Sequence, residues 1–254
     1  MIASFPMYDW PEVREATGAW WRGLSRHLGV SIELDRNPDH FAAWRRDDLF
    51  LSQTCGYPFT HEFKGLLKYV CTPHYAVPGC EGANYCSFIF ARVKQPLDSF
   101  GGSIAAVNNP DSMSGMLALK LVFAPFATHG KFFSKAIETG SHINSMIAVR
   151  DGKADVCAID AVCVAMAKRY RPDNLEGLVE IARSPIVPSL PYVTRSGNIG
   201  DIRRALVAAF ADSELQAWRD RLFLSGQSVL PATAYERITD LESEMQRAGG
   251  LDLL

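Results

Sequence analysis

The sequence predicts an α/β fold built as two lobes, and three observations lead to this prediction. Short apolar segments of strand length alternate with amphipathic helical segments along most of the 254 residues. The strand–helix units fall into two groups, since the chain leaves the first group near residue 88 and returns near residue 190. No repeat of solenoid length and no low-complexity segment interrupts the alternation. We therefore expect one lobe from residues 1–87 and 190–254, and a second from residues 88–189.

The first lobe begins with a strand and a long helix. Residues 2–8 form an apolar run that Pro6 ends, and Pro11 suits the first turn of the helix over residues 11–29. Gly29 suits the end of that helix. The elements expected next are a strand at 31–35, a helix at 40–48, a strand at 49–53, a loop at 54–61, a strand at 67–77, a turn at 78–84 and a β-rich crossing segment at 85–92.

In the second lobe the alternation restarts. It predicts a strand at 103–107, helices at 115–123, 130–140 and 141–152, a strand at 154–160, a helix at 161–170 and a strand at 178–185. Gly152 suits the position after a helix end. A second crossing segment follows at 190–197, and the remainder is expected to be mostly helical, at 199–212, 214–226 and 234–250.

Composition and charge exclude several classes of function. The net charge of −2 gives no support to nucleic-acid or anionic-membrane binding, which need a basic surface. No window approaches eighteen uncharged apolar residues, so we expect no transmembrane helix. The opening "MIASFPMYDW" is too short and polar for a signal peptide. The chain is then either cytoplasmic or preceded by a leader that has been removed.

The six cysteines do not form a recognisable metal module. No Cys-x-x-Cys pair occurs, so we expect no metal site and no cofactor. A disulfide such as Cys80–Cys86 is expected only in an oxidising compartment. Cys157 and Cys163 lie in apolar segments and are interpreted as small buried residues. The other two cysteines are Cys55 and Cys71.

The stretch "NNPDSMSG", residues 108–115, combines a strand end with a helix start. Ser112 and Ser114 lie where a helix begins, and Gly115 would let a ligand approach the backbone closely. A helix amino end has unpaired N–H groups and a positive dipole, so it can hold an anion. The same residues also suit plain capping, which serine commonly performs. Taken alone, the motif favours capping.

Four further strand-end residues are candidates for a binding site. His142 follows Ser141 at a second helix start and could donate to an oxyanion, although a histidine there is more often exposed. Asp160 ends a buried strand and needs a partner, either a ligand or the amides of the next helix. Tyr8 and Tyr57 follow strands of the first lobe and could form the walls of a pocket.

Four motifs together resemble a known family. "NNPDSMSG", "TGSHINSMIAVRDGKADVCAID" and "SPIVPSLPYVT", in this order, and "SQTCGYP" before them, are similar to the PhnD-like substrate-binding components of phosphate, phosphite and phosphonate ABC importers. These are type 2 periplasmic binding proteins, and the resemblance spans about residues 1 to 200. It implies a Venus-flytrap pair of α/β lobes joined by two crossing strands, with an oxyanion in the cleft between them.

The resemblance also implies which residues bind the ligand. They are the Ser-x-Ser-Gly helix start with its central Met113, the histidine of the later helix, one carboxylate on the far side and a tyrosine of the first lobe. In this chain these are Ser112, Met113, Ser114, Gly115, His142, Asp160 and Tyr57.

Two residues depart from the family pattern. Members often have a hydroxyl residue at the position of Met113, and many have Glu at the position of Ile143. That Glu would pair with a ligand amino group, so its absence disfavours an aminoalkylphosphonate. Another small oxyanion or an organic acid remains open.

The resulting expectation is a non-enzymatic receptor for a small anionic ligand. It would be periplasmic and monomeric, and it would deliver its ligand to an ABC permease in the membrane. A rival is an enzyme on the same fold that uses Cys55 or Cys86 with His74 or His142. A second rival is a cytoplasmic ligand-sensing module. The nucleotide-binding, hydrolase and zinc-protease motifs of known enzymes do not occur in the sequence.

Overall fold

The computed structural model describes residues 1–231 and 233–253 and divides the chain into two compact units. The first unit comprises Met1–Ala76, Glu81–Asn84 and Pro188–Ala234. The second comprises Val77–Cys80, Tyr85–Val187 and Tyr235–Leu254. The expected boundaries near residues 87 and 189 lie within a few residues of points where the chain passes from one unit to the other, at Asn84–Tyr85 and at Val187–Pro188. The C-terminal segment differs more, since residues 235–254 were expected in the first lobe and belong to the second unit.

A mixed five-stranded sheet forms the centre of the first unit. Its order is β1-β2-β12-β3-β13. β1 and β2 are parallel, whereas β12 is antiparallel to both β2 and β3, and β13 is antiparallel to β3. The first three strands in chain order therefore point the same way and end at the same edge. The strands are β1 (Ile2–Ser4), β2 (Leu49–Gln53), β3 (Lys68–Tyr75), β12 (Tyr192–Thr194) and β13 (Leu224–Ser228).

Helices of the first unit pack beside this sheet. α1 contacts both α7 and α8, and α2 contacts β1 and β2. α1 begins after a short 3₁₀ turn that starts at Pro11. The helix ends at Gly29, whose φ of 66° lies in the left-handed region. The helices are α1 (Arg14–Leu28), α2 (His40–Arg45), α3 (Gly56–Thr60), α7 (Ile199–Ala211) and α8 (Gln216–Arg221), with 3₁₀ turns η1 (Pro11–Val13) and η6 (Ser213–Leu215).

Three predictions for the first unit are wrong in detail. Residues 31–35 contain only an isolated bridge, between Leu34 and Ala3, rather than a strand. The expected loop at 54–61 contains helix α3. The expected helix at 214–226 ends at Arg221 because Phe223 adopts a left-handed φ of 58°, and the chain then pairs with β3 as β13. Pairing with a neighbouring strand decides this last case over local propensity.

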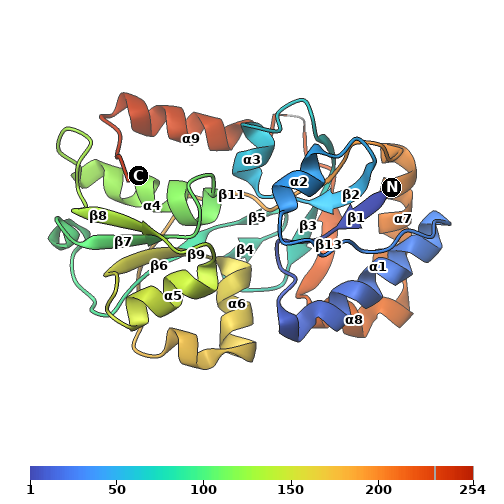
Figure 1. Ribbon diagram of the computed structural model, residues 1–254, viewed down its shortest axis with the longest axis horizontal. Helices are drawn as coiled ribbons and strands as arrows, with labels where there is room; N and C mark the ends of the chain where they lie inside the picture. The colour runs from blue at the N-terminus through green and yellow to red at the C-terminus, as the bar shows by residue number, and fades with distance from the viewer. Residues whose placement is uncertain (232, 254) are drawn as a thin grey trace. The chain divides into compact units, whose positions relative to one another are not determined.

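A second five-stranded sheet, in the order β10-β6-β9-β7-β8, forms the centre of the second unit. β7 is parallel to β8 and to β9, whereas β6 is antiparallel to β9 and β10. Figure 1 shows α5 and α6 on one face of this sheet and α4 with α9 on the other. The strands are β6 (Ser87–Ala91), β7 (Ile104–Val107), β8 (Lys135–Glu138), β9 (Val156–Asp160) and β10 (Val179–Arg183).

The helix that follows β7 starts irregularly. Residues Met113–Leu117 form a π-helical turn, η3, which continues directly into α4 (Ala118–Phe123). The other helices are α5 (His142–Arg150), α6 (Ala161–Tyr170) and α9 (Glu236–Arg247), with 3₁₀ turns η2 (Leu97–Phe100), η4 (Ala124–Phe126) and η5 (Pro172–Leu175).

Residues 130–140 were expected to form a helix and instead contain strand β8. β8 is bounded by Gly130 and Gly140, whose φ angles are 73° and 78°. Its backbone pairs in register with β7, from Ile104 opposite Lys135 to Val107 opposite Glu138. The four-residue strand is therefore formed by a long-range pairing that a local pattern cannot reveal.

α9 is a predicted helix whose partner was not predicted. Its apolar residues Ile238, Leu241 and Met245 recur at helical spacing and are buried. They belong to the second unit, in which α9 contacts α4.

A short three-stranded sheet forms where the chain passes between the units. Its strands, in the order β11-β5-β4, are β4 (Cys80–Glu81), β5 (Asn84–Tyr85) and β11 (Val187–Pro188). Each of these strands contains one residue of each unit.

The buried hydroxyl of Ser52 links three elements of the first unit. It donates to the carbonyl of Ser4 at 2.6 Å and accepts from Trp44 Nε1 at 3.0 Å. The Ser52→Ala substitution leaves a buried indole N–H without its acceptor, so we expect the free energy of unfolding to fall by about 1–3 kcal/mol. Chemical denaturation measures this loss. The exposed Ser99→Ala change is the control and should stay within about 0.5 kcal/mol of wild type.

Candidate functional site

The carboxyl ends of β7, β8 and β9 meet at one edge of the second sheet because these strands are parallel. Three connections start there, at Asn108, at Thr139 and at Asp160. Each leads within a few residues into a helix. In open α/β sheets, this edge is where ligands bind.

Ser112 caps the helix after β7. Its Oγ accepts a hydrogen bond from Gly115 N at 3.0 Å, and its carbonyl accepts one from Leu117 N at 2.9 Å. The capping interpretation of Ser112 therefore fits the structure. The first-turn amides of a helix point out of its amino end. A capped helix start thus still has N–H groups and a dipole that can act on an anion.

Met113 contributes only its backbone to this helix start. Its side chain is 1% exposed and packs in the core of the second unit. Where the family pattern has a hydroxyl, this chain has a core residue.

Gly115 is required by the side chain of Asn108. A Cβ at position 115 would lie 1.7 Å from Asn108 Oδ1 and 3.3 Å from Ser112 Oγ. The carboxamide of Asn108 therefore occupies the space beside the helix start that a larger residue would need. Sequence reasoning did not select Asn108 as a site residue. Its position directly after a strand end was the signal available.

Ser114 and His142 are brought together by the fold. Ser114 Oγ and His142 Nε2 are hydrogen-bonded at 2.8 Å, although 28 residues separate them in the chain. Ser114 is 5% exposed and His142 is partly buried. We call Ser112, Ser114, Gly115 and His142 the serine–histidine cluster.

Hydroxyl groups fix the connection that presents His142. Ser141 caps α5 by accepting from Asn144 N at 3.2 Å, and Thr139 Oγ1 lies 2.7 Å from Ser145 Oγ. The side-chain Nδ2 of Asn144 donates to the carbonyl of Thr139 at 2.8 Å. These bonds hold the first turn of α5 in place, so the imidazole meets Ser114 in a defined position.

His142 is neutral near pH 7 in this environment. Burial lowers the pKa of His142 to about 4, and the backbone of Ala158 opposes this shift only in part. An anion bound beside the ring would favour the protonated form and raise this pKa. The cluster therefore carries oriented hydrogen-bond donors rather than a fixed positive charge.

Asp160 caps the next helix. Its Oδ1 accepts from Val162 N at 2.7 Å and from Cys163 N at 3.2 Å, and the residue is 1% exposed. The pKa of the Cys163 thiol is raised, first by burial and then by this carboxylate. The amides of Val162 and Cys163 are the partners that sequence reasoning considered as the alternative to a ligand.

Tyr57 lies on α3 of the first unit. Its ring stacks on His61 with centroids 3.8 Å apart and an interplanar angle of 11°. α3 begins three residues after the carboxyl end of β2. Tyr57 therefore lies near the edge of the first sheet where β1, β2 and β3 end.

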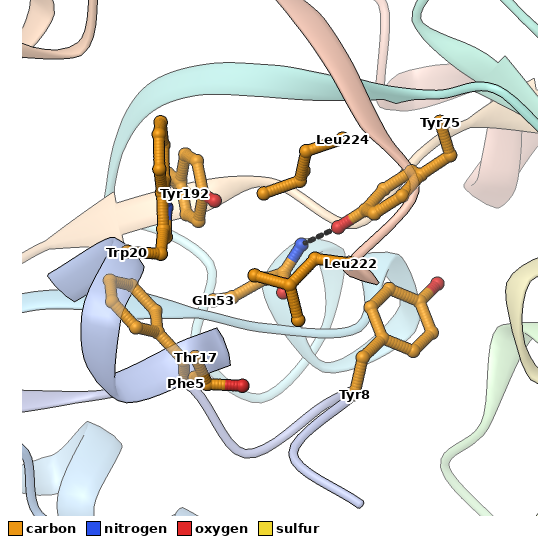
Figure 2. Close-up of a pocket in the computed structure, with 9 residues that line it drawn as sticks. All are labelled: Phe5, Tyr8, Thr17, Trp20, Gln53, Tyr75, Tyr192, Leu222 and Leu224. Carbon is orange, nitrogen blue, oxygen red and sulfur yellow. Dashed lines mark hydrogen bonds between the residues drawn. The ribbon is translucent and has the colours of Figure 1, made fainter. Parts of the chain in front are cut away.

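Tyr8 lines a pocket at the same edge. It follows β1 and packs edge-to-face on Tyr75, the last residue of β3, at a centroid distance of 5.3 Å. Figure 2 shows the pocket. Gln53 and Leu222 lie in its middle, with Tyr8 and Tyr75 on one side of them and Trp20 and Tyr192 on the other. The lining residues are Phe5, Tyr8, Thr17, Trp20, Gln53, Tyr75, Tyr192, Leu222 and Leu224.

Of these lining residues, sequence reasoning selected only Tyr8. Gln53 ends β2, and its Nε2 donates to Tyr75 Oη at 2.8 Å and to the carbonyl of Leu190 at 3.1 Å. Both Gln53 and Tyr75 are strand-end residues, and that position was the available signal. Their contact depends on strand order in the sheet, which the sequence pattern does not give.

The cysteines carry no disulfide, and all six lie within the described residues. Burial raises the pKa of the thiols of Cys71, Cys80, Cys86 and Cys157, so these groups are protonated near pH 7. Across residues 1–231 and 233–253, no group of three or more His, Cys, Asp or Glu side chains could hold a metal ion. None of the helices in those residues combines the length and apolarity of a membrane-spanning segment.

A family model described as the periplasmic substrate-binding protein of a phosphonate ABC transporter matches residues 2–241. The chain belongs to this family. The resemblance inferred from the four motifs is thereby confirmed. A search of curated proteins found no match.

Solved structures of the same architecture extend over nearly the whole chain. PhnD1 of Prochlorococcus marinus, in complex with methylphosphonate, has a TM-score of 0.79 at 13% identity, with 97% of this chain and 98% of that chain covered. The binding protein component of an ABC phosphonate transporter from Pseudomonas aeruginosa has a TM-score of 0.73 at 18% identity, covering 97% and 87%. XAC2383 from Xanthomonas citri, bound to ATP, has a TM-score of 0.71 at 19% identity, covering 98% and 97%.

These similarities confirm the predicted fold class. Members of the type 2 periplasmic-binding-protein fold share the two α/β units described above. At such low identities, structural similarity establishes the fold but transfers no ligand. The family match adds that this chain is a substrate-binding component of an ABC transporter.

The Gly115→Ala substitution tests the packing of the helix start against Asn108. The new Cβ would collide with Asn108 Oδ1, so we expect the free energy of unfolding to fall by about 1–3 kcal/mol. Thermal or chemical denaturation measures the change. The double substitution Asn108→Ala with Gly115→Ala removes the colliding atoms and should recover most of the loss. An equal loss in the single and double variants would contradict this account.

The lowered pKa of His142 predicts a pH dependence of stability. A histidine with a folded-state pKa of about 4 and an ordinary value of 6.5 favours folding fully above pH 6.5. That contribution is lost as the pH falls from 6.5 towards 4, by up to roughly 3 kcal/mol. Denaturant titrations between pH 4 and 7.5 should show a shallower pH dependence for His142→Gln than for wild type. Parallel curves for the two proteins would contradict a depressed pKa at His142.

Proposed function

We propose that this protein captures a small oxyanion for an ABC importer, holding it between its two units. The ligand class is a phosphonate, phosphite, phosphate or a related organic acid. One observation carries the proposal, namely the 2.8 Å hydrogen bond that joins Ser114 to His142 across two helix starts at one sheet edge. The family match to phosphonate-binding proteins supports the same ligand class.

The serine–histidine cluster has the donors that an oxyanion requires. The first-turn amides of the η3–α4 helix and of α5 point out of their amino ends, and each helix dipole adds a partial positive charge. The Ser114 hydroxyl can turn from His142 towards a ligand oxygen. Charge-assisted hydrogen bonds of this kind are about twice as strong as neutral ones. Selectivity for an anion then arises in a chain whose net charge is −2.

The residue after His142 disfavours a ligand amino group. Ile143 is partly buried beside the cluster and offers no carboxylate to an ammonium. Met113 removes one hydroxyl from the helix start, since its side chain is directed into the core. Both features favour an anion without a cationic substituent.

The first unit contributes the opposite wall in this proposal. Tyr8 and Tyr57 follow the strands that end at its ligand-binding edge, and each has a phenol that can donate to an oxygen. The short sheet of β4, β5 and β11 supplies the segments about which the units would close on the ligand. The closed form would be presented to the permease in the membrane. We propose that the protein acts as a periplasmic monomer and binds no nucleic acid.

The structure offers little support to a cysteine-dependent enzyme. Burial raises the pKa of Cys86, which disfavours the thiolate that catalysis requires. His142 is hydrogen-bonded to Ser114, and His74 Nε2 lies 2.8 Å from Ser228 Oγ. In these contacts, each histidine is hydrogen-bonded to a serine hydroxyl rather than to a cysteine thiol. The family match likewise favours a transport component over a cytoplasmic sensing module.

The Ser114→Ala substitution tests the proposal directly. Removing one hydroxyl that donates to a charged ligand should weaken binding about 10- to 100-fold. Isothermal titration calorimetry with methylphosphonate, phosphite and phosphate measures the affinities. Ser99→Ala, on an exposed 3₁₀ turn, should bind like wild type. If the folded wild-type protein binds none of these oxyanions, or if Ser114→Ala binds them equally well, the proposal is wrong.

A further inference from the structure

A polar cavity of the first unit has no part in the proposed anion site. It measures about 170 Å³, and its lining includes residues that follow β1 and the first residue of α1. Every residue that lines it belongs to the first unit, whereas the serine–histidine cluster belongs to the second. By volume the cavity holds roughly ten water-sized groups, so it suits a molecule of about ten non-hydrogen atoms or fewer.

The carboxylate of Asp9 is buried in the lining of this cavity, and only one of its oxygens has a donor. The side chain is 10% exposed, and its Oδ2 accepts from Arg36 Nε at 2.8 Å. Oδ1 is buried, and no group in residues 1–231 and 233–253 donates a hydrogen bond to it. A buried acceptor without a donor costs free energy, and more so when it carries charge. A bound molecule that donates to Oδ1 would remove this cost.

Two guanidinium groups lie beside this carboxylate. Arg36 is fixed in place, since its Nη2 also donates to the carbonyl of Arg14 at 3.0 Å. The side chain of Arg14 is 59% exposed, and its Nε lies 3.9 Å from Asp9 Oδ2. A guanidinium group binds a carboxylate through two parallel hydrogen bonds. The cavity therefore combines an acceptor for a cationic donor with a partner for an anionic group.

The balance of charge in the lining disfavours a ligand of a single charge. The charged side chains are Asp9, Asp35, Arg14 and Arg36, together with the imidazole of His40. A metal cation would be repelled by the two guanidinium groups, and a simple anion would leave Asp9 Oδ1 without a donor. A zwitterion satisfies both, because its ammonium and its carboxylate meet opposite charges.

The remaining walls of the cavity are largely apolar. Phe5, Pro6, Leu34 and Pro38 contribute hydrocarbon surface to the lining. Contact with such surface favours an uncharged group on the ligand. Together with the volume, this points to a small molecule whose only charges are one ammonium and one carboxylate.

We propose that this cavity is a second binding site, and that it takes a small α-amino acid with an uncharged side chain. The ammonium donates to Asp9 Oδ1, and the carboxylate is bound by the guanidinium group of Arg14. The inference goes beyond the proposed function and does not depend on it, because the cavity and the serine–histidine cluster are built by different units. The protein therefore has sites for two ligands of different chemistry.

A series of related ligands tests the proposal. In calorimetric titrations of the full chain, glycine and L-alanine should each bind with a stoichiometry of one. L-Alaninamide lacks the carboxylate, N-acetyl-L-alanine lacks the ammonium, and L-tryptophan exceeds the volume. Each of these three should bind about tenfold more weakly than L-alanine, or weaker still. Absence of amino-acid binding by the folded wild-type protein, or equal affinities for L-alanine and any of the three, would overturn the proposal.

The Arg14→Gln substitution tests the proposed partner of the carboxylate. It should weaken L-alanine about tenfold and leave L-alaninamide unchanged, because the amide has no carboxylate to lose a partner. Arg22→Gln, at an exposed arginine of α1 outside the cavity lining, is the matched control and should bind L-alanine like wild type. An equal loss for L-alanine and L-alaninamide in Arg14→Gln would overturn the assignment.

The Asp9→Asn substitution tests the proposed partner of the ammonium. Loss of the carboxylate charge should weaken L-alanine about tenfold or more and should affect N-acetyl-L-alanine less. Unchanged binding of L-alanine by the folded variant would overturn the proposal. Because Asp9 also pairs with Arg36, circular dichroism and melting temperature establish whether the variant is folded. Arg14→Gln keeps the proposal testable if it is not.

The outcomes separate this inference from the proposed function. Ser114→Ala should leave the affinity for L-alanine unchanged, and Arg14→Gln should leave the affinity for methylphosphonate unchanged. Binding of L-alanine that Ser114→Ala weakens and Arg14→Gln does not would place the amino acid elsewhere and overturn the inference. Binding of L-alanine by a protein that binds no oxyanion would overturn the proposed function and support the second site.

Discussion

Parallel strands impose the arrangement on which the candidate site depends. Because β7, β8 and β9 run in one direction, the chain must leave all three at the same edge, and a helix amino end follows each strand. The positive ends of three helix dipoles therefore gather there without any need for charged side chains. The hydrogen bond between Ser114 and His142 joins two of these helix starts into one cluster. The third start is closed by Asp160, which occupies its amides.

This division of roles among three helix starts has an electrostatic logic. A carboxylate accepts from the first-turn amides at the start of α6. At the other two helix starts, hydroxyl groups accept from first-turn amides without neutralising the positive end of the helix dipole. A neutral histidine completes the donor set without adding a permanent charge. In the proposed function, the site would hold an anion when one is present and would need no counter-charge when it is absent. Such balance is what a receptor that must also release its ligand requires.

The sequence predicted the features that depend on local chemistry. The caps at Ser112 and Ser141, the end of α1 at Gly29 and the buried strand before Asp160 follow from residue type and spacing. Features that depend on long-range pairing were not predicted. β8 and β13 have no strong strand pattern of their own and form because β7 and β3 offer them edges. The location of α9 depended in the same way on an apolar partner that the pattern could not specify.

The candidate site shows the same limit. The motif resemblance assigned Ser114 and His142 to one site, whereas composition and spacing alone favoured capping. Met113, expected in the site with the two serines, has a side chain that is 1% exposed. Gln53 and Tyr75 were not selected because their proximity results from the order of strands in the sheet.

The assignment of α9 to the second unit has a consequence for synthesis of the chain. Every segment of the first unit leaves the ribosome before α9 does, because that unit ends at Ala234. The second unit begins at Val77 yet lacks its cover over α4 until residues 235–254 are made. The first unit can therefore complete its fold during translation, while the apolar face of α4 stays uncovered until the end. A nascent chain halted before Tyr235 would display that face to chaperones.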